Sequence, residues 1–224
     1  MKTFVVRLWL PDRPGALGQV ASRIGAVRGS VVGIEILERG GGQAVDELVV
    51  ELPDTELVDM LVREIRQVDG VGVEEVRPLS GGRHHDPRLD ALEAMAQLVG
   101  ATDVVELVDG LVAQAMRVVG ADWGVVVDNE PDGNEVVARM GDAPSGAWLR
   151  AFVAGSAQSA TIPETGDIAW APLPSSRLAL VLGREGVSFR ARERHEVAAF
   201  ARVADTRHRE LTRVASRARH PSMG

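Results

Sequence analysis

The segment PDRPG at residues 11–15 holds the groups best suited to chemistry in this sequence. It lies between an alternating apolar run and the first helical spacing, so it is predicted to form a strand-to-helix turn. The N–H groups that begin a helix carry partial positive charge and bind anions. Pro14 fixes φ for the helix start, and Gly15 leaves the backbone open to close approach. Because Asp12 adds a carboxylate that can bind an ammonium, the turn suits both ends of a zwitterion.

Other residues that could do chemistry are few. The chain of 224 residues has no cysteine, which excludes disulfides, thiolate metal ligands and a thiol nucleophile. His84 and His85 are adjacent, but no further ligand lies near them in the sequence, so a solvated linker explains them better than a metal site. His195 and His208 lie on different faces of one predicted helix. We therefore predict no metal, no cofactor and no catalytic residue.

The elements that must position the turn fill the first third of the chain. Residues 3–79 are predicted to form strand, helix, strand, strand, helix and strand, with apolar spacings of two in the strands and of three or four in the helices. Gly29 is expected to stop the first helix, and residues 39–43 to form a glycine-rich hairpin loop. The strands are predicted at 3–10, 31–37, 45–52 and 71–76, and the helices at 17–27 and 55–68.

A polar stretch at residues 80–87 breaks this periodicity and is predicted to be a linker. Residues 88–224 open with two amphipathic helices, of which the second is expected to be capped by Thr102, and close with a long helix. Because the strands between them do not alternate with helices, the predicted fold class is α+β, with an antiparallel sheet and flanking helices. The strands are predicted at 123–127, 136–140, 168–173 and 178–182, and further helices at 147–153 and from 191 to about 218.

Residues 1–79 resemble an ACT domain, the ferredoxin-like βαββαβ regulatory module attached to many enzymes of amino-acid metabolism. The resemblance rests on element order and length, on PDRPGAL at residues 11–17 and on GSVVGIE at residues 29–35. It implies that an amino acid binds between two ACT domains. By position, Asp12 would face the ammonium, backbone amides at residues 15–17 would meet the carboxylate, and residues 30–32 would approach from the partner domain. The candidate ligand-binding residues are Asp12, Arg13, Pro14, Gly15, Ala16, Leu17, Ser30, Val31 and Val32.

One position departs from the ACT pattern. Members of that family often have an asparagine at the start of the second strand, where this chain has Val31 beside Ser30. Either Ser30 replaces the hydrogen bond of the asparagine, or the ligand loses one contact. The alternative interpretation of the turn is an Asp-capped corner with no ligand, because many ACT domains serve only in structural pairing.

Residues 88 to about 215 resemble a GAF-type sensor domain. The resemblance rests on the paired helices, on GADWG at residues 120–124 and on FRARE at residues 189–193. It implies a small-molecule pocket on the sheet or a scaffold for dimerisation, without attachment of a chromophore to cysteine. Trp148 and Trp170 could line such a pocket, but large aromatic residues more often belong to the core.

Charge and hydropathy limit the partners. The net charge is −7, yet the segment from Ser188 onward has nine arginines against four acidic residues. This basic C-terminal helix has no interleaved aromatic residues, so the polar side of a terminal helix is favoured over nucleic-acid binding. No apolar run is long enough to cross a membrane, and the N-terminus lacks a signal-peptide core, so the expected location is the cytoplasm.

We predict a non-catalytic regulatory protein, in which an amino acid bound at an ACT–ACT interface of a homodimer signals through the GAF-like domain, with a protein partner as a further option. Two alternatives stay open: a purely structural dimerisation protein, and an acyltransferase-like enzyme under ACT control. The second alternative depends on residues 97–102 and 117–122, which match the Q/R-x-x-G-x-G/A phosphate loop of GNAT acetyltransferases only in part.

Overall fold

A computed structural model describes residues 1–79, 87–130, 136–158 and 166–219, and the chain divides into two compact units, Met1–Asp86 and Pro87–Gly224. The linker predicted at 80–87, with His84 and His85, lies outside the described residues except for the last position, which begins a helix. Among the described residues, no helix is both long enough and apolar enough to span a bilayer.

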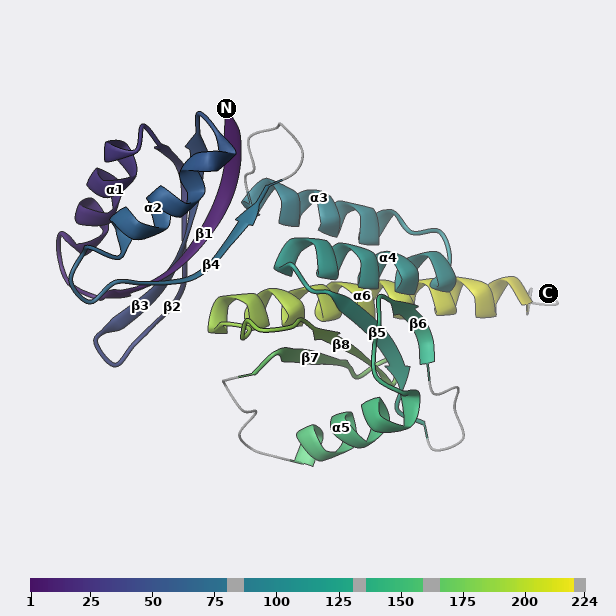
Figure 1. The fold of residues 1–224 in the computed structure, drawn as a ribbon. Helices are drawn as coiled ribbons and strands as arrows, with labels where there is room; N and C mark the ends of the chain where they lie inside the picture. The colour runs from purple at the N-terminus through teal and green to yellow at the C-terminus, as the bar shows by residue number, and fades with distance from the viewer. Residues whose placement is uncertain (80–86, 131–135, 159–165, 220–224) are drawn as a thin grey trace. The chain divides into compact units, whose positions relative to one another are not determined.

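The N-terminal unit is a four-stranded antiparallel sheet with two helices on one face (Figure 1). Its strand order is β2-β3-β1-β4, so β2 and β4 are the edges, and the βαββαβ prediction is confirmed. The elements are β1 (Lys2–Pro11), α1 (Ala16–Ala26), β2 (Ser30–Gly40), β3 (Gln43–Leu52), the 3-10 turn η1 (Thr55–Leu57), α2 (Val58–Ile65) and β4 (Gly72–Pro78).

Period-two alternation decides which side of this sheet is the core. On β1 the residues Phe4, Val6, Leu8 and Leu10 face the helices and are buried against Val20 of α1 and Leu61 of α2. The same register on β3 sends its even-numbered residues inward, because successive strand residues point to opposite faces. The apolar stripe of α1, spaced by three and four, closes over them.

The end of α1 differs from the prediction of a glycine stop. The helix ends at Ala26, and Arg28, not Gly29, takes the left-handed conformation at φ 60. Gly29 has a different role, because a Cβ there would lie 2.8 Å from Ile24 and 3.1 Å from Leu52. Glycine is therefore required at this position by the close approach of the chain to the core, and the helix stop falls one residue earlier.

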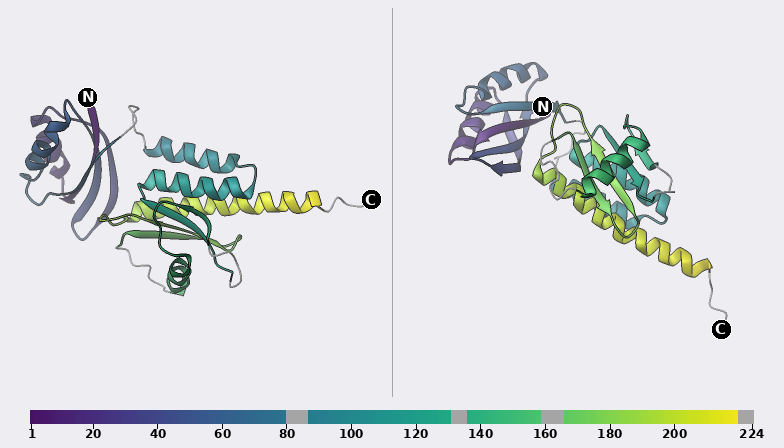
Figure 2. Two further views of the ribbon diagram at one scale, coloured as in Figure 1. Left: turned by 45° about the vertical axis from the view of Figure 1, so that its right-hand side comes forward. Right: turned by 90° about the horizontal axis from the view of Figure 1, so that it is seen from below.

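The C-terminal unit is a second antiparallel sheet, with strand order β6-β5-β8-β7. It is covered by helices on both faces, as Figures 1 and 2 show, with α3, α4 and α6 on one side and α5 on the other. The prediction of an α+β domain with flanking helices is confirmed. The elements are α3 (Pro87–Gly100), α4 (Val104–Val119), β5 (Trp123–Asp128), β6 (Val136–Met140), α5 (Gly146–Gln158), β7 (Ile168–Leu173), β8 (Leu178–Gly183) and α6 (Ala191–Arg219).

The start of α4 corrects the prediction that Thr102 is its cap. The capping residue is Asp103, whose side chain accepts a hydrogen bond from the N–H of Glu106 at 2.9 Å. Glu106 in turn accepts from the N–H and the hydroxyl of Thr102, both at 2.8 Å. This arrangement resembles a capping box, except that Glu106 bonds back to the residue before the cap. Thr102 and Asp103 can both cap a helix, and the register of α4 selects Asp103.

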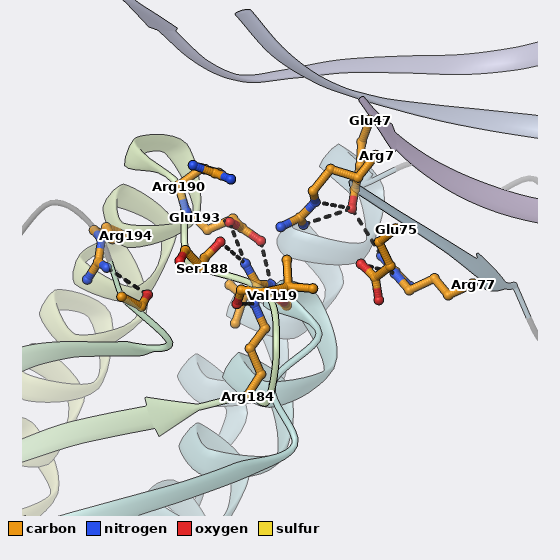
Figure 3. A network of polar contacts seen from close by, with 12 residues as sticks. Arg7, Glu47, Glu75, Arg77, Val119, Arg184, Ser188, Arg190, Glu193 and Arg194 are labelled. Atoms are coloured by element: carbon orange, nitrogen blue, oxygen red, sulfur yellow. Dashed lines mark hydrogen bonds and ion pairs between the residues drawn. The ribbon is translucent and has the colours of Figure 1, made fainter. Parts of the chain in front are cut away.

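A buried arginine joins three parts of the C-terminal unit, as the close view in Figure 3 shows. Arg184 donates to both carboxylate oxygens of Glu193, at 2.7 and 2.9 Å, and to the carbonyl of Val119 at 2.9 Å. It also donates to the carbonyl of Ser188, and its guanidinium lies 4.1 Å from the ring centre of Phe189. These contacts fix the end of β8 to the end of α4 and to the first turn of α6.

Candidate functional site

The turn after β1 is tied to the β2–β3 hairpin. The N–H of Asp12 donates to the carbonyl of Gly42 at 3.0 Å, and the N–H of Arg13 donates to the carbonyl of Pro11 at 2.8 Å. Gly41 and Gly42 form the hairpin turn with positive φ at both positions. These bonds hold Asp12 at one end of the sheet, in an exposed position.

Helix α1 begins without a side-chain cap. Gly15 precedes it in the left-handed region, at φ 87, and no acidic residue lies in the first turn. A Cβ at Gly15 would meet no atom within 4 Å, so its backbone conformation and not crowding favours glycine here. The N–H of Ala16 donates to the carbonyl of Arg13 at 3.3 Å, whereas the N–H groups of Leu17 and Gly18 have no backbone partner in the described chain and keep their partial positive charge.

Asp12 does not cap this helix, so the alternative interpretation of the turn is wrong about the cap, while its statement that the corner binds no ligand stays a prediction. Within the described part of the chain, the carboxylate of Asp12 has no hydrogen-bond or ion-pair partner. The structure thus brings together residues 12–17 of the predicted site as an exposed carboxylate, an open glycine and an uncapped helix start. That arrangement can bind an ammonium and a carboxylate at once.

A second carboxylate, Asp46 of β3, lies near this corner and was not among the predicted residues. It is only 4% exposed, and its Oδ1 has no hydrogen-bond partner in the described chain. Burial raises the pKa of Asp46, the positive charge of Arg39 lowers it, and the negative charge of Asp12 raises it further. A sequence signal for Asp46 existed: it is a charged residue at an inward position of an otherwise apolar alternation, Ala44, Leu48, Val50 and Leu52.

The predicted residues on β2 lie at the other end of the sheet. Ser30 pairs with Glu51, whereas the hairpin that holds Asp12 is closed by the pair Gly40 and Gln43. Ser30 and Val32 are exposed and Val31 is half-buried. Within one copy of the chain, residues 30–32 and Asp12 are therefore separated by most of the length of β2, roughly 30 Å at 3.3 Å per residue.

The edge strand β2 presents an apolar face. Val32, Ile34 and Ile36 are 44%, 52% and 39% exposed. Such an edge carries unpaired backbone groups and is a ready template for pairing with another strand. β2 also contains two irregularities in its pairing with β3, at Val32 and at Leu37, and the second lies beside Asp46.

An open groove of about 520 Å³ lies between α1 and residues 67–69, which follow α2. None of the predicted ligand residues lines it. Its central arginine, Arg23, donates to Glu64 at 3.2 Å and to Gln67 at 2.9 Å. Since this polar side chain is already paired within the unit, we do not assign the ligand to the groove.

The other charged cluster of the N-terminal unit is internally paired. Glu47 accepts two hydrogen bonds from Arg7, at 3.2 and 2.8 Å, and a longer one from Arg77 at 3.5 Å (Figure 3). Glu47 and Arg7 lie opposite each other on β3 and β1, and Arg77 belongs to the neighbouring strand β4. This ladder of alternating charges across three strands stabilises the sheet and has the geometry of a structural network.

The C-terminal unit offers no comparable site in the residues that the structure describes. No group of three acidic, histidine or cysteine side chains there could hold a metal ion. His195 bonds to the carbonyl of Ala191 through Nδ1, and burial lowers the pKa of His208, with Asp205 opposing the shift. Trp148 stacks on Phe152 at 5.5 Å between ring centres.

The two segments that partly match an acetyltransferase phosphate loop lie in unsuitable places. Residues 117–122 end α4, where Gly120 is the C-terminal cap, and lead into β5. Residues 97–102 end α3, and the next helix start is already occupied by the carboxylates of Asp103 and Glu106. A phosphate site needs free N–H groups at a helix start, and neither segment supplies them.

Family comparison agrees with the N-terminal geometry. The ACT domain family model matches residues 4–70, from near the start of β1 to the turn before β4. The N-terminal unit is an ACT domain. Its β1–α1 corner is thus the ACT corner, and Asp46 is a feature of this chain on the inner face of the ACT sheet. A search of curated proteins gives no match.

Solved structures with similar folds include domains of both kinds. The ACT domain of a GTP pyrophosphokinase from Chlorobium tepidum is 20% identical and covers 35% of this chain and 100% of its own, with a TM-score of 0.29. The GAF domain of a putative sensor histidine kinase from Pseudomonas syringae pv. tomato is 13% identical, covering 61% and 93%, with a TM-score of 0.37. The bacteriophytochrome RpBphP3 from R. palustris is 14% identical, covering 84% and 44%, with a TM-score of 0.42.

Proposed function

We propose that this protein is a non-catalytic regulatory protein, whose ACT domain binds an amino acid between two copies of the chain. The observation that carries the proposal is Asp12, an exposed carboxylate without a partner in the described chain, beside the uncapped start of α1. The ammonium of the ligand pairs with Asp12, and its carboxylate accepts hydrogen bonds from the N–H groups of Gly15 and Leu17, because the N–H of Ala16 already donates to the carbonyl of Arg13 at 3.3 Å.

A second copy completes the site through the edge strand β2. In a two-fold pair of antiparallel β2 strands, the start of each strand faces the end of the other. Ser30, Val31 and Val32 of one copy then lie opposite the hairpin to which Asp12 of the other is bonded. The exposed side chains of Ile34 and Ile36 become buried in the same contact.

The regulatory step follows from this shared site. A ligand that touches both copies binds best in one arrangement of the pair, and so it shifts the population toward that arrangement. The C-terminal GAF-like unit, which follows the ACT domain in the chain, is the part that transmits the change or pairs in its turn. The coupling is reciprocal, so an output state of the C-terminal unit changes the affinity for the amino acid by the same factor.

The test is a calorimetric screen of the twenty amino acids against the full chain, with Asp12→Ala as the site variant. Asp59→Ala, at an exposed aspartate of α2, is the matched control. We expect at least one amino acid to bind, Asp12→Ala to weaken it by about tenfold or more, and Asp59→Ala to leave it unchanged. Trp9 lies two residues before the turn, is 38% exposed, and gives a fluorescence readout.

Two results would replace this proposal. A dimer that binds no amino acid would favour a purely structural pairing module. A measurable affinity for acetyl-coenzyme A would favour an acyltransferase-like enzyme, although residues 97–102 and 117–122 do not present free N–H groups. Equal binding by Asp12→Ala and the unaltered protein would show that the ligand does not bind at the β1–α1 corner.

A further inference from the structure

The side chain of Asp46 is buried, and one of its carboxylate oxygens has no hydrogen-bond partner in the described chain. On β3 it pairs in register with Leu8 of β1 and Ile36 of β2, and it points to the inner face of the sheet. Its Oδ1 is buried, without a hydrogen-bond partner in the described residues, at a position only 4% exposed. A buried carboxylate without a partner is costly, because it has lost its water and gained nothing in exchange.

Asp46 and Asp12 belong to one corner of the domain. Pro11 pairs with Gln43, and Asp46 follows Gln43 by three residues along β3, which is about 10 Å in an extended strand. The hydrogen bond from Asp12 to Gly42 fixes the turn to the hairpin that leads into this strand. Burial raises the pKa of Asp46, and the negative charge of Asp12 adds to that effect.

The charges of this corner do not match a neutral zwitterion. One ammonium satisfies one carboxylate, and the ligand's own carboxylate is met by the start of α1, so Asp46 would stay unpaired. Arg39, the positive side chain that acts on Asp46, is exposed on β2 and forms no ion pair with it among the described residues. A metal ion would need more ligands, and no group of three suitable side chains is present in the described chain.

We propose that the amino acid bound at this ACT site is a basic one, such as lysine or arginine, whose side-chain cation pairs with Asp46 while its α-ammonium pairs with Asp12. This inference rests on the proposed function and names the ligand class of the same site. A short methylene chain separates the two cations of such a ligand, and Ile36, which pairs with Asp46 on the neighbouring strand and is exposed, provides apolar contact for it. Ile36 is 39% exposed, so Asp46 lies one strand in from an accessible edge.

The experiment compares each basic amino acid with a neutral ligand of the same shape, by calorimetry on the full chain. The pairs are lysine with norleucine, and arginine with citrulline. We expect the basic member to bind about tenfold or more tightly than its neutral counterpart, as a charge-assisted hydrogen bond requires. Asp46→Asn should remove this preference while keeping the affinity for the neutral ligand, and Asp12→Asn should weaken both members of each pair.

The two proposals fail in different ways. If neutral amino acids bind as tightly as basic ones, or if Asp46→Asn leaves the preference intact, the ligand class is wrong and the amino-acid site stands. If no amino acid binds, the proposed function is wrong and this inference with it. Asp46→Asn is expected to fold, because it removes a buried charge. Thermal unfolding of the variant is the control that checks whether the domain is intact.

Discussion

Burial raises the pKa of Asp46, and the negative charge of the exposed carboxylate of Asp12, at the β1–α1 corner of the ACT domain, raises it further. Asp205 in the C-terminal unit is buried to a similar degree but has the opposite environment. It accepts hydrogen bonds from the N–H of Ser175 at 3.1 Å and from the N–H and hydroxyl of Ser176, both at 3.0 Å. Asp205 is thus satisfied by hydrogen bonds within the fold, whereas Oδ1 of Asp46 has none in the described chain.

The first prediction concerns stability at neutral pH. Asp46→Asn removes a buried charge without a partner and should raise the free energy of unfolding of the ligand-free protein, by about 1–3 kcal/mol. Asp205→Asn removes the charge and replaces one of the two accepting oxygens by an NH2 group, which cannot accept, so it should lower the free energy of unfolding by a similar amount. Urea denaturation at pH 7 measures both. A loss of stability in Asp46→Asn would show that this carboxylate has a stabilising partner.

The second prediction is how the difference in stability between Asp46→Asn and the unaltered protein depends on pH. The folded-state pKa of Asp46 is raised above its usual 3.8 by burial, so ionising Asp46 costs stability as pH rises through that pKa. The free energy of unfolding of Asp46→Asn should exceed that of the unaltered protein increasingly from about pH 4 upward, and the two should be similar below pH 4. Chemical denaturation between pH 3 and pH 8 gives the profile, and an advantage that grows toward acid pH would contradict it.

Asp205 should show the reverse profile. Burial would raise its pKa, but the hydrogen bonds from Ser175 and Ser176 outweigh burial and lower the pKa below 3.8. Its stabilising contribution is then present above the unfolded pKa and is lost as pH falls through the folded pKa. Asp205→Asn should therefore cost most at neutral pH and least at the acid end. A cost that does not change with pH would mean that its charge has no part in the contact.

The fourth prediction tests the apolar edge of β2. Ile34→Arg places a charge in the proposed antiparallel contact and should convert a dimer that depends on the ACT domain to a monomer, or weaken it by about tenfold or more. Met60→Arg is the control, because Met60 is also an exposed apolar side chain of this domain, at 44%. Analytical ultracentrifugation over a concentration series measures the association. If both variants associate as the unaltered protein does, β2 is not the contact.

The fifth prediction concerns the buried arginine of the C-terminal unit. Arg184→Gln leaves the carboxylate of Glu193 buried without its cation and should cost about 3–5 kcal/mol of stability. Arg177→Gln breaks the exposed ion pair with Glu130 and should cost less than about 1 kcal/mol. Thermal and urea unfolding compare the two. Similar losses would indicate that the burial of Arg184 is not what gives the contact its strength.

The order of elements follows from the amino-acid sequence, because apolar spacings of two and of three or four fix which segments can bury a face. The sequence also located the turn at residues 11–15, since proline and glycine restrict the backbone locally. The sequence pattern was less decisive where two adjacent residues could both cap or end a helix. Thr102 and Asp103 are both able to cap α4, and Arg28 and Gly29 both stand at the end of α1, so the register of the folded chain decided each case.

The surroundings of the site could not be predicted before the strands were placed in the folded domain. The alternation of β3 shows that Asp46 points inward, but its missing partner and its nearness to Asp12 depend on strands that are far apart in sequence. The same holds for residues 30–32, which the pairing of β2 with β3 places at the end of the sheet away from Asp12. Spacing along a chain is a local property, whereas burial, register and the coupling of two charges arise only when the strands pack together.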